Sequence, residues 1–347
     1  MIKIFTSRHK LTTVEITLLG GLGVAVSTLS VLSLRVSKVD DYEVLTAASA
    51  GLIGAYSSPI TTGPGDLDAK QTSINPNWAA LIVGYLEEAG VRPGDPVAVG
   101  MTGSFPGLNI AAILAIEAYG AHPLWVVSQG STAWGANRPA FTFLDMEKVL
   151  FEKKIIHGRA LAATLGGNNN SGAELDNEGR TALRSTIVSR QIPFIDATPL
   201  SAAIDSEMAV FKRAAGGKRV PLYINIGTGY ASLGTMNAAT ILSTGLNTAK
   251  KLAELQAEPV EGVATRFLAQ GAQVLNLYDI VDLARQKGLP IAPAVTPLPG
   301  TGGLFFAPGY SVWMNVSLLV FYIAAVLAFA NGYTNFLTKN PRKNELL

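Results

Sequence analysis

The chain has 347 residues, of which 48% are hydrophobic and 15% charged, so it can bury a large core and is too apolar to be mainly disordered. Its formal net charge is only +2, and several Lys and Arg residues gather near the termini, which argues against a nucleic-acid-binding groove. The sequence contains no cysteine, which excludes disulfides, thiolate metal sites and a cysteine nucleophile.

Residues 16–34 form an apolar run without a charged side chain, long enough to cross a bilayer as a helix. Lys3, Arg8 and Lys10 precede it, which predicts a cytoplasmic N-terminus over residues 1–15. The alternative is a cleaved signal peptide, but no small-x-small site follows the run at the usual distance.

Residues 35–292 alternate apolar runs of strand length with stretches of helical period, which predicts an extracytoplasmic α/β domain. We expect a Rossmann-like layered fold around a mainly parallel sheet. The predicted strands are 96–100, 124–128, 159–165, 193–196, 222–226 and 289–292. The predicted helices are 77–89, 108–119, 177–190, 201–215, 236–255 and 278–287.

A connector rich in Pro and Gly at 293–310 leads to a second apolar run at 311–333, which predicts a second transmembrane helix. Lys339, Arg342 and Lys343 lie in the segment 334–347 that follows, so the C-terminus is also expected in the cytoplasm. A buried core helix is the alternative for this run. Two transmembrane helices flanking the domain would place the protein in the inner or plasma membrane.

The loop GMTGSFPGLN at 100–109 follows a predicted strand and precedes a predicted helix. Such a loop offers backbone N–H groups and a helix dipole to an anion, and Thr102, Gly103 and Ser104 would contact it. The sequence matches neither a Walker A loop nor a dinucleotide-binding fingerprint. A tight strand-to-helix turn that needs glycine is the alternative.

Three further loops contain small polar residues and follow predicted strands. The loop at 128–138 combines hydroxyls, an aromatic ring, an amide and a cation, which suits a polar organic ligand, although its tryptophan could simply pack in the core. In a parallel sheet these loops converge at the carboxyl ends of the strands. The expected ligand-binding residues here are Ser128, Ser131, Trp134, Asn137, Arg138, Asn168, Gly227, Thr228 and Gly229.

The segments VAVGMTG at 97–103 and YINIGTG at 223–229 resemble each other. If the likeness is a true repeat, the domain has two similar halves, each with an equivalent glycine loop.

No catalytic residue is assigned, and Ser104 is the best candidate for a nucleophile. His122 and His157 are the histidines of the domain available as a base, and neither has a telling spacing. Asp145 and Glu147 resemble a solvated first turn of a helix more than a catalytic pair. No metal-binding motif is present, and neither a metal nor a cofactor is expected.

A local basic patch surrounds a Gly-Gly pair after a predicted helix. It is either a solvated helix end or a docking point for an acidic chain. Its members are Lys212, Arg213, Lys218 and Arg219.

Five segments together resemble the poly-γ-glutamate system protein family of bacteria: 54–62, 75–78, 97–109, 134–137 and 143–147. Proteins of this family are membrane-associated accessory proteins of poly-γ-glutamate synthesis and export. The resemblance implies a capsule or cell-envelope role that involves the polymer or a glutamate-containing ligand, other membrane subunits and membrane lipid, with no nucleic-acid partner.

Two other functions stay open. The domain could be a hydrolase or transferase acting on γ-glutamyl bonds through Ser104 or an activated water. Alternatively, the strand, glycine loop and helix could form a sugar-phosphate-type ligand-binding domain.

Overall fold

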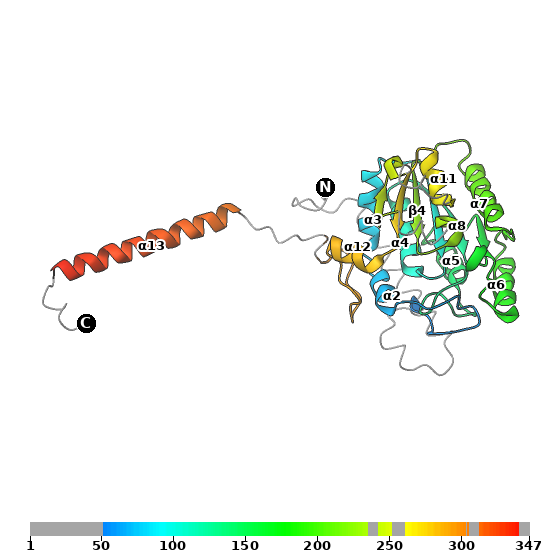
Figure 1. The fold of residues 1–347 in the computed structure, drawn as a ribbon, viewed down its shortest axis with the longest axis horizontal. Coiled ribbons are helices and arrows are strands. Elements are labelled where there is room, and N and C mark those ends of the chain that lie inside the picture. The colour runs from blue at the N-terminus through cyan, green and yellow to red at the C-terminus, as the bar shows by residue number, and fades with distance from the viewer. Residues whose placement is uncertain (1–50, 235–241, 252–260, 303, 305–311, 340–347) are drawn as a thin grey trace. The chain divides into compact units, whose positions relative to one another are not determined.

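A six-stranded sheet forms the centre of the α/β unit in the computed structural model, which describes residues 51–234, 242–251, 261–302, 304 and 312–339 (Figure 1). The strand order is β3-β2-β1-β4-β6-β5, and only the pairing of β5 with β6 is antiparallel. The fold is therefore α/β with a mostly parallel sheet, as the sequence predicts. The strands are β1 (Pro96–Thr102), β2 (His122–Ser128), β3 (Ala162–Thr164), β4 (Leu222–Ile226), β5 (Gly245–Asn247) and β6 (Gln273–Leu277).

Helices cover both faces of this sheet (Figure 1). On one face α3 and α4 pack against each other, and on the other α7, α8 and α11 share a second core cluster. The α-helices of the described part are α2 (Leu67–Ser73), α3 (Trp78–Glu88), α4 (Pro106–Ala118), α5 (Phe143–Glu152), α6 (Asn177–Ser189), α7 (Leu200–Ala214), α8 (Tyr230–Leu233), α11 (Val263–Ala269), α12 (Ile280–Lys287) and α13 (Val312–Lys339).

Strand β1 shows how the two cores form, because successive side chains of a strand point to opposite faces. Val97 and Val99 join the core beneath α3 and α4, whereas Ala98 joins the core on the α7 side. Gly100 leaves room for the neighbouring strand, since a Cβ there would lie 2.0 Å from the hydroxyl of Tyr223. The small residues of β1 thus admit a large aromatic ring from β4.

Glycine ends two of the predicted helices in the expected way. Gly90 and Gly120 follow α3 and α4 with φ angles of 71° and 85°, in the left-handed region that glycine adopts without a Cβ clash. Helix α6 begins at Asn177, as expected, and Asp176 is its N-cap, accepting a hydrogen bond from the N–H of Gly179.

Three element predictions are wrong. Residues 193–196 form only a bridge, in which Phe194 pairs with Ala163 beside β3. Residues 289–292 form no strand, and the described part of the predicted helix 236–255 contains β5 and a 3₁₀ turn (Ala249–Lys251). The buried strand β6 was missed because polar Gln273 and Asn276 interrupt its apolar run.

Of the two predicted transmembrane helices, only the second falls on described residues. The first, 16–34, lies outside them, as does the segment 1–15 that is predicted to be cytoplasmic. The second falls on α13, which belongs to a separate compact unit and whose side chains are described over 315–329. Over the described positions, no helix is both long and apolar enough to cross a membrane.

Candidate functional site

The topological switch point of the sheet lies between β1 and β4, because the strands that follow β1, β2 and β3, lie on one side, and the strands that follow β4, β5 and β6, lie on the other. The loops that leave these two strands are in contact. A Cβ built on Gly227 would lie 3.0 Å from Oγ1 of Thr102, and one on Gly229 would lie 3.5 Å from its Cγ2. The two similar glycine segments of the sequence are therefore neighbours in space.

The other two polar loops join the same edge. The N–H of Gly103 donates to the carbonyl of Ser128 at 2.8 Å, and the N–H of Ala136 donates to the carbonyl of Gly103 at 2.7 Å. Ser128 in turn contacts Asn170, with 3.2 Å between its Oγ and the Asn170 Oδ1. The structure thus brings the four predicted loops together at the carboxyl ends of the strands.

Ser104 lies beside a buried lysine that the sequence did not single out. The Lys70 ammonium, only 2% exposed, donates to the carbonyl of Ser104 at 2.6 Å and to Oγ1 of Thr132 at 2.8 Å. Thr132 donates to Oγ of Ser104 through its N–H at 3.0 Å and through its hydroxyl at 3.2 Å. Lys70 also lies 4.0 Å from the centre of the Phe105 ring.

Burial disfavours the charged form of Lys70 and lowers its pKa to about 7, although the nearby carboxylate of Asp66 acts in the opposite direction. Near neutral pH a fraction of the Lys70 side chain is therefore an uncharged amine. An uncharged amine is able to accept a proton, which an ordinary surface lysine rarely does.

A second polar cluster lies behind Ser128. The Nδ2 of Asn170 donates to Glu207 of α7 at 3.0 Å, and the hydroxyl of Thr164 donates to the Asn170 Oδ1 at 2.7 Å. Burial raises the pKa of Glu207 to about 7, only partly offset by the Asn170 hydrogen bond. Below that pH the Glu207 side chain is a neutral acid.

Several predicted ligand-binding residues hold the loops themselves. Asn137 is fully buried, accepts from the N–H of Ala55 at 2.8 Å, and donates to the carbonyl of Ala55 and the hydroxyl of Thr61. Ser131 is also fully buried and donates to the carbonyl of Thr132. The Asn137 side chain thus holds the 54–62 segment against the loop at 128–138, whereas the Ser131 side chain bonds within its own loop.

Four other predicted residues of these loops are more accessible. Trp134 is half-buried and packs against the exposed Tyr56, with ring centres 5.6 Å apart. Arg138 is half-buried, and Asn168 and Thr228 are exposed. They are the members of the predicted set best able to meet a ligand from solvent.

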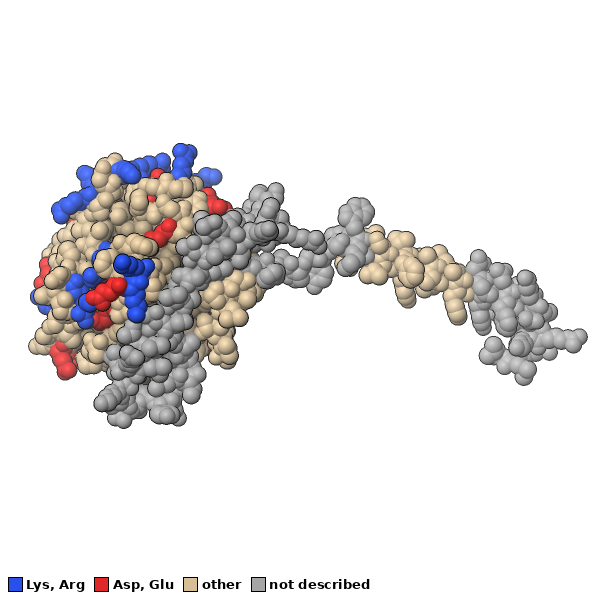
Figure 2. All heavy atoms as spheres, turned by 180° about the vertical axis from the view of Figure 1, so that it is seen from behind, with Lys and Arg blue, Asp and Glu red and all other residues tan. Residues whose placement is uncertain are grey.

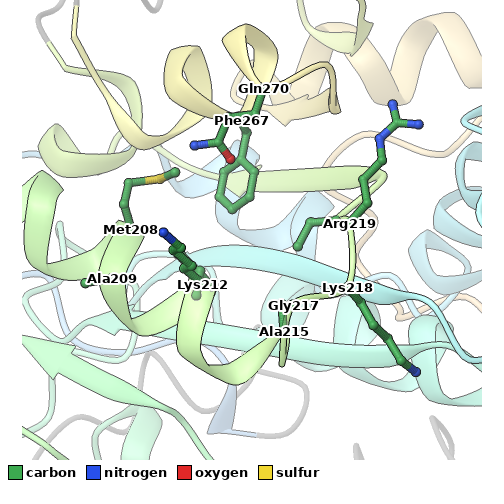
Figure 3. A pocket seen from close by; sticks show the side chains of 11 residues that line it. Met208, Ala209, Lys212, Ala215, Gly217, Lys218, Arg219, Phe267 and Gln270 are labelled. Atoms are coloured by element: carbon green, nitrogen blue, oxygen red, sulfur yellow. The ribbon is translucent and has the colours of Figure 1, made fainter.

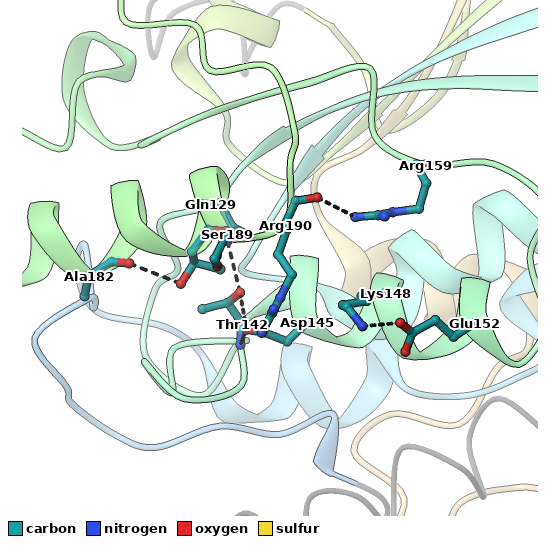
Figure 4. Close-up of polar contacts among 10 residues, drawn as sticks. Gln129, Thr142, Asp145, Lys148, Glu152, Arg159, Ala182, Ser189 and Arg190 are labelled. Carbon is teal, nitrogen blue, oxygen red and sulfur yellow. Dashed lines mark hydrogen bonds and ion pairs between the residues drawn. The ribbon is translucent and has the colours of Figure 1, made fainter.

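Asp145 and Glu147 do not form a solvated turn, because both are buried. Figure 4 shows Asp145 beside Thr142 and Arg190. Asp145 accepts from Nε of Arg190 at 2.7 Å and from the N–H of Thr142 at 2.7 Å, which caps α5. Glu147 is fully buried and accepts from Trp125, Arg159 and Ala160. Both carboxylates have structural partners rather than a shared site.

Histidine does not supply a base next to Ser104 in the described structure. His157 pairs with Glu117 at 3.0 Å on the exposed surface, and His122 begins β2 at the opposite end of that strand. Among the described residues, no group of three or more His, Asp or Glu side chains is placed to hold a metal ion.

A pocket of about 470 Å³ opens between α7 and α11, near the amino ends of β4 and β6 (Figure 3). Met208, Phe211 and Phe267 give it apolar walls. The amine of Lys212 and the amide of Gln270 lie on the same side as Met208, while the charged ends of Lys218 and Arg219 extend outward on the other. None of the described residues that line the pocket is acidic.

The rim of this pocket contains three of the four residues of the predicted basic patch. Lys218 donates to the carbonyl of Gly94 at 3.3 Å and Arg219 to that of Gly271 at 2.6 Å, so both side chains are oriented by the backbone. Figure 2 shows Lys and Arg side chains gathered along the edge of the domain at which α11 lies in Figure 1. This edge is opposite the one with the four loops.

Comparisons of the chain with protein-family models, with curated proteins and with solved structures give no match.

Proposed function

We propose that this chain is a membrane-anchored accessory protein of poly-γ-glutamate biosynthesis or export, whose α/β domain binds the polymer, its precursor or the synthase. The pocket between α7 and α11 is the observation that carries this proposal, because cationic residues surround an apolar cavity without any acidic lining residue. The resemblance of segments such as 97–109 and 143–147 to that family supports it.

The chemistry of the polymer fits such a pocket. Each γ-linked glutamate unit has one free carboxylate and two methylene groups within the main chain. Methylenes would contact Met208 and Phe267, and carboxylates would meet Lys212 on one side and Arg219 on the other. A short stretch of polymer would bind, which agrees with a domain that is near neutral overall.

Charge reversal at the rim is expected to weaken polymer binding. Lys212→Glu combined with Arg219→Glu should raise the Kd of the detergent-solubilised protein for poly-γ-glutamate about tenfold or more, a change of roughly 1.4 kcal/mol or above. Biolayer interferometry at several salt concentrations would measure it, and the difference should shrink as salt screens the charges.

A matched control uses another exposed arginine and lysine. Arg285→Glu with Lys153→Glu makes the same change in net charge, and neither residue lines the pocket. Equal loss of binding in both double variants would show that net charge, rather than the pocket, determines affinity.

We propose further that the protein is anchored by the segments 16–34 and 311–333. Residues 289–338 contain no charged side chain, and the described apolar side chains of α13 are exposed, including Leu318 at 60%, Phe321 at 73% and Leu327 at 64%. A helix that exposes apolar side chains all round is unstable in water and suits a lipid environment. Lys339, Arg342 and Lys343 favour a cytoplasmic C-terminus.

Protease accessibility tests this topology. In spheroplasts, whose plasma membrane is intact and open to the medium, added protease should cut within residues 35–310. Epitope tags on both termini should survive. Tags that are digested at the same rate as the middle of the chain would contradict the double anchor. Permeabilised cells, in which all segments should be cut, are the control.

A further inference from the structure

The buried lysine beside Ser104 is unused by the polymer-binding pocket and lies at the opposite edge of the sheet. It comes from α2, whereas Ser104 follows β1 and Thr132 belongs to the loop after β2. Three separate segments therefore bring an amine and two hydroxyls together at the topological switch point.

We infer that Ser104, Thr132 and Lys70 form a serine-nucleophile site for acyl transfer, in which Lys70 takes the Ser104 proton through the Thr132 hydroxyl. The substrate class is a carbonyl compound with an amide or ester bond. This inference does not depend on polymer binding at the α7–α11 pocket.

The distances allow a proton to pass along the three groups. Lys70 Nζ is 2.8 Å from Thr132 Oγ1, which is 3.2 Å from Ser104 Oγ. With Lys70 protonated, the hydrogen bonds run from the ammonium to Thr132 and from Thr132 to Ser104. Hydroxyl hydrogens rotate freely, so with a neutral amine the two bonds reverse and Ser104 donates.

Lys70 has the surroundings that a base needs near neutral pH. Burial lowers its pKa to about 7. Among the described residues, the carboxylate of Asp66 is the charged group that acts on this pKa, and it raises it. The other groups in contact with the amine are neutral: the carbonyl of Ser104, the hydroxyl of Thr132 and the ring of Phe105. An activated serine next to such a lysine is a known type of nucleophile–base pair.

The reaction balances with these groups alone. Oγ of Ser104 bonds to the carbonyl carbon, its proton moves to Thr132, and the Thr132 proton moves to Lys70. The tetrahedral intermediate collapses, the carbon–nitrogen or carbon–oxygen bond breaks, and the leaving group takes a proton from Lys70. Water then attacks the acyl-Ser104 ester, and Lys70 accepts the water proton by the same route. The bond between the carbonyl carbon and Ser104 Oγ breaks, the carboxylic acid product leaves, and Lys70 returns the proton through Thr132 to Ser104 Oγ.

Two features of the backbone support the nucleophile. The N–H of Thr132 donates to Ser104 Oγ at 3.0 Å, which stabilises negative charge on that oxygen. Ser104 also lies just before α4, so the positive end of that helix dipole is near the reacting atoms. Only 6% of the Ser104 surface is exposed, so a small reagent is the appropriate first probe.

A small alkyl fluorophosphonate tests the site without knowledge of the substrate. The full-length protein in detergent should form one covalent adduct, located on Ser104 by peptide mass spectrometry, and Ser104→Ala should form none. The labelling rate should rise with pH through a midpoint near 7, as Lys70 loses its proton. No adduct on Ser104 at pH 8 in the folded protein would overturn the inference.

Variants of the two helper residues separate proton transfer from packing. Lys70→Arg keeps a positive charge that does not deprotonate, and Thr132→Val removes the connecting hydroxyl; each should slow labelling at least tenfold. Thr132→Ser, which restores the hydroxyl, should retain most of the rate. Thermal melting shows whether each variant is folded, and folded Lys70→Arg protein that labels at the wild-type rate and pH profile would disprove the role of Lys70.

The Lys212→Glu and Arg219→Glu double variant should label at Ser104 like the wild type. Loss of polymer binding and loss of labelling are thus separately measurable, so failure of one proposal leaves the other standing.

Discussion

Replacing Glu147 by alanine is expected to lower the free energy of unfolding by roughly 3–5 kcal/mol, the range for breaking a buried ionic pair. The carboxylate is fully buried and accepts from Nε1 of Trp125 at 2.8 Å, Nε of Arg159 at 2.8 Å and the N–H of Ala160 at 2.7 Å. Alanine would leave three donors without their acceptor and a guanidinium without its counter-charge. Urea unfolding followed by tryptophan fluorescence would measure the loss.

Glu147→Gln is the matched control because it keeps the size of the side chain and one acceptor oxygen. It should be destabilised less than Glu147→Ala, since one oxygen still accepts hydrogen bonds while the ion pair with Arg159 is lost. If Glu147→Ala lowers the free energy of unfolding by less than about 1 kcal/mol, which is the range for an exposed ion pair, a buried carboxylate at this position is contradicted.

Glu207→Gln is expected to stabilise the domain at pH 8 by roughly 3 kcal/mol and to change stability little at pH 4. Burial raises the folded-state pKa of Glu207 to about 7, whereas an unfolded glutamate releases its proton near 4.5. Between these values the folded state binds more protons, so the Glu207 contribution to stability falls as pH rises from about 4.5 to about 7 and is constant above. Glutamine has no charge to bury and keeps an acceptor for Asn170.

The measurement is urea unfolding of wild type and variant at several pH values from 4 to 8. Lys70 also contributes a pH dependence, but it is present in both proteins and cancels in their difference. Parallel stability curves for the two proteins across this range would contradict a neutral buried acid at position 207.

The convergence of the glycine loops was predictable from sequence. An apolar run followed by Gly, Thr or Ser and then a helical period marks a strand, a turn and a helix, and parallel strands put such turns at one edge. The loops after β1 and β4 follow this pattern and are in contact in the structure.

Lys70 was not predictable in the same way. It lies in the polar segment LDAKQTS, which suggests a solvated helix, and its partners are 34 and 62 residues away. Burial of its side chain results from tertiary contacts with Ser104, Phe105 and Thr132. The sequence around Lys70 does not predict these contacts. Glu207 was missed for the same reason, because its partner Asn170 is 37 residues away, in the loop that follows β3.

For Asp145 and Glu147 the local sequence pattern predicted solvent exposure, and this prediction is wrong. Acidic residues in a first helical turn are commonly exposed, yet α5 packs so that both are buried. Arginines at 159 and 190 supply the compensating charge from segments that the α5 sequence does not reveal.

The two outer strands of the sheet are its shortest, with three residues each in β3 and β5. Beside β3, the N–H of Ala163 donates to the carbonyl of Pro193, and the N–H of Ile195 donates to the carbonyl of Ala163, so an irregular segment already occupies that border. Unpaired outer strands are templates on which a second molecule can add its own strand. These short outer strands therefore offer little for intermolecular strand addition, which protects the domain against aggregation through its sheet.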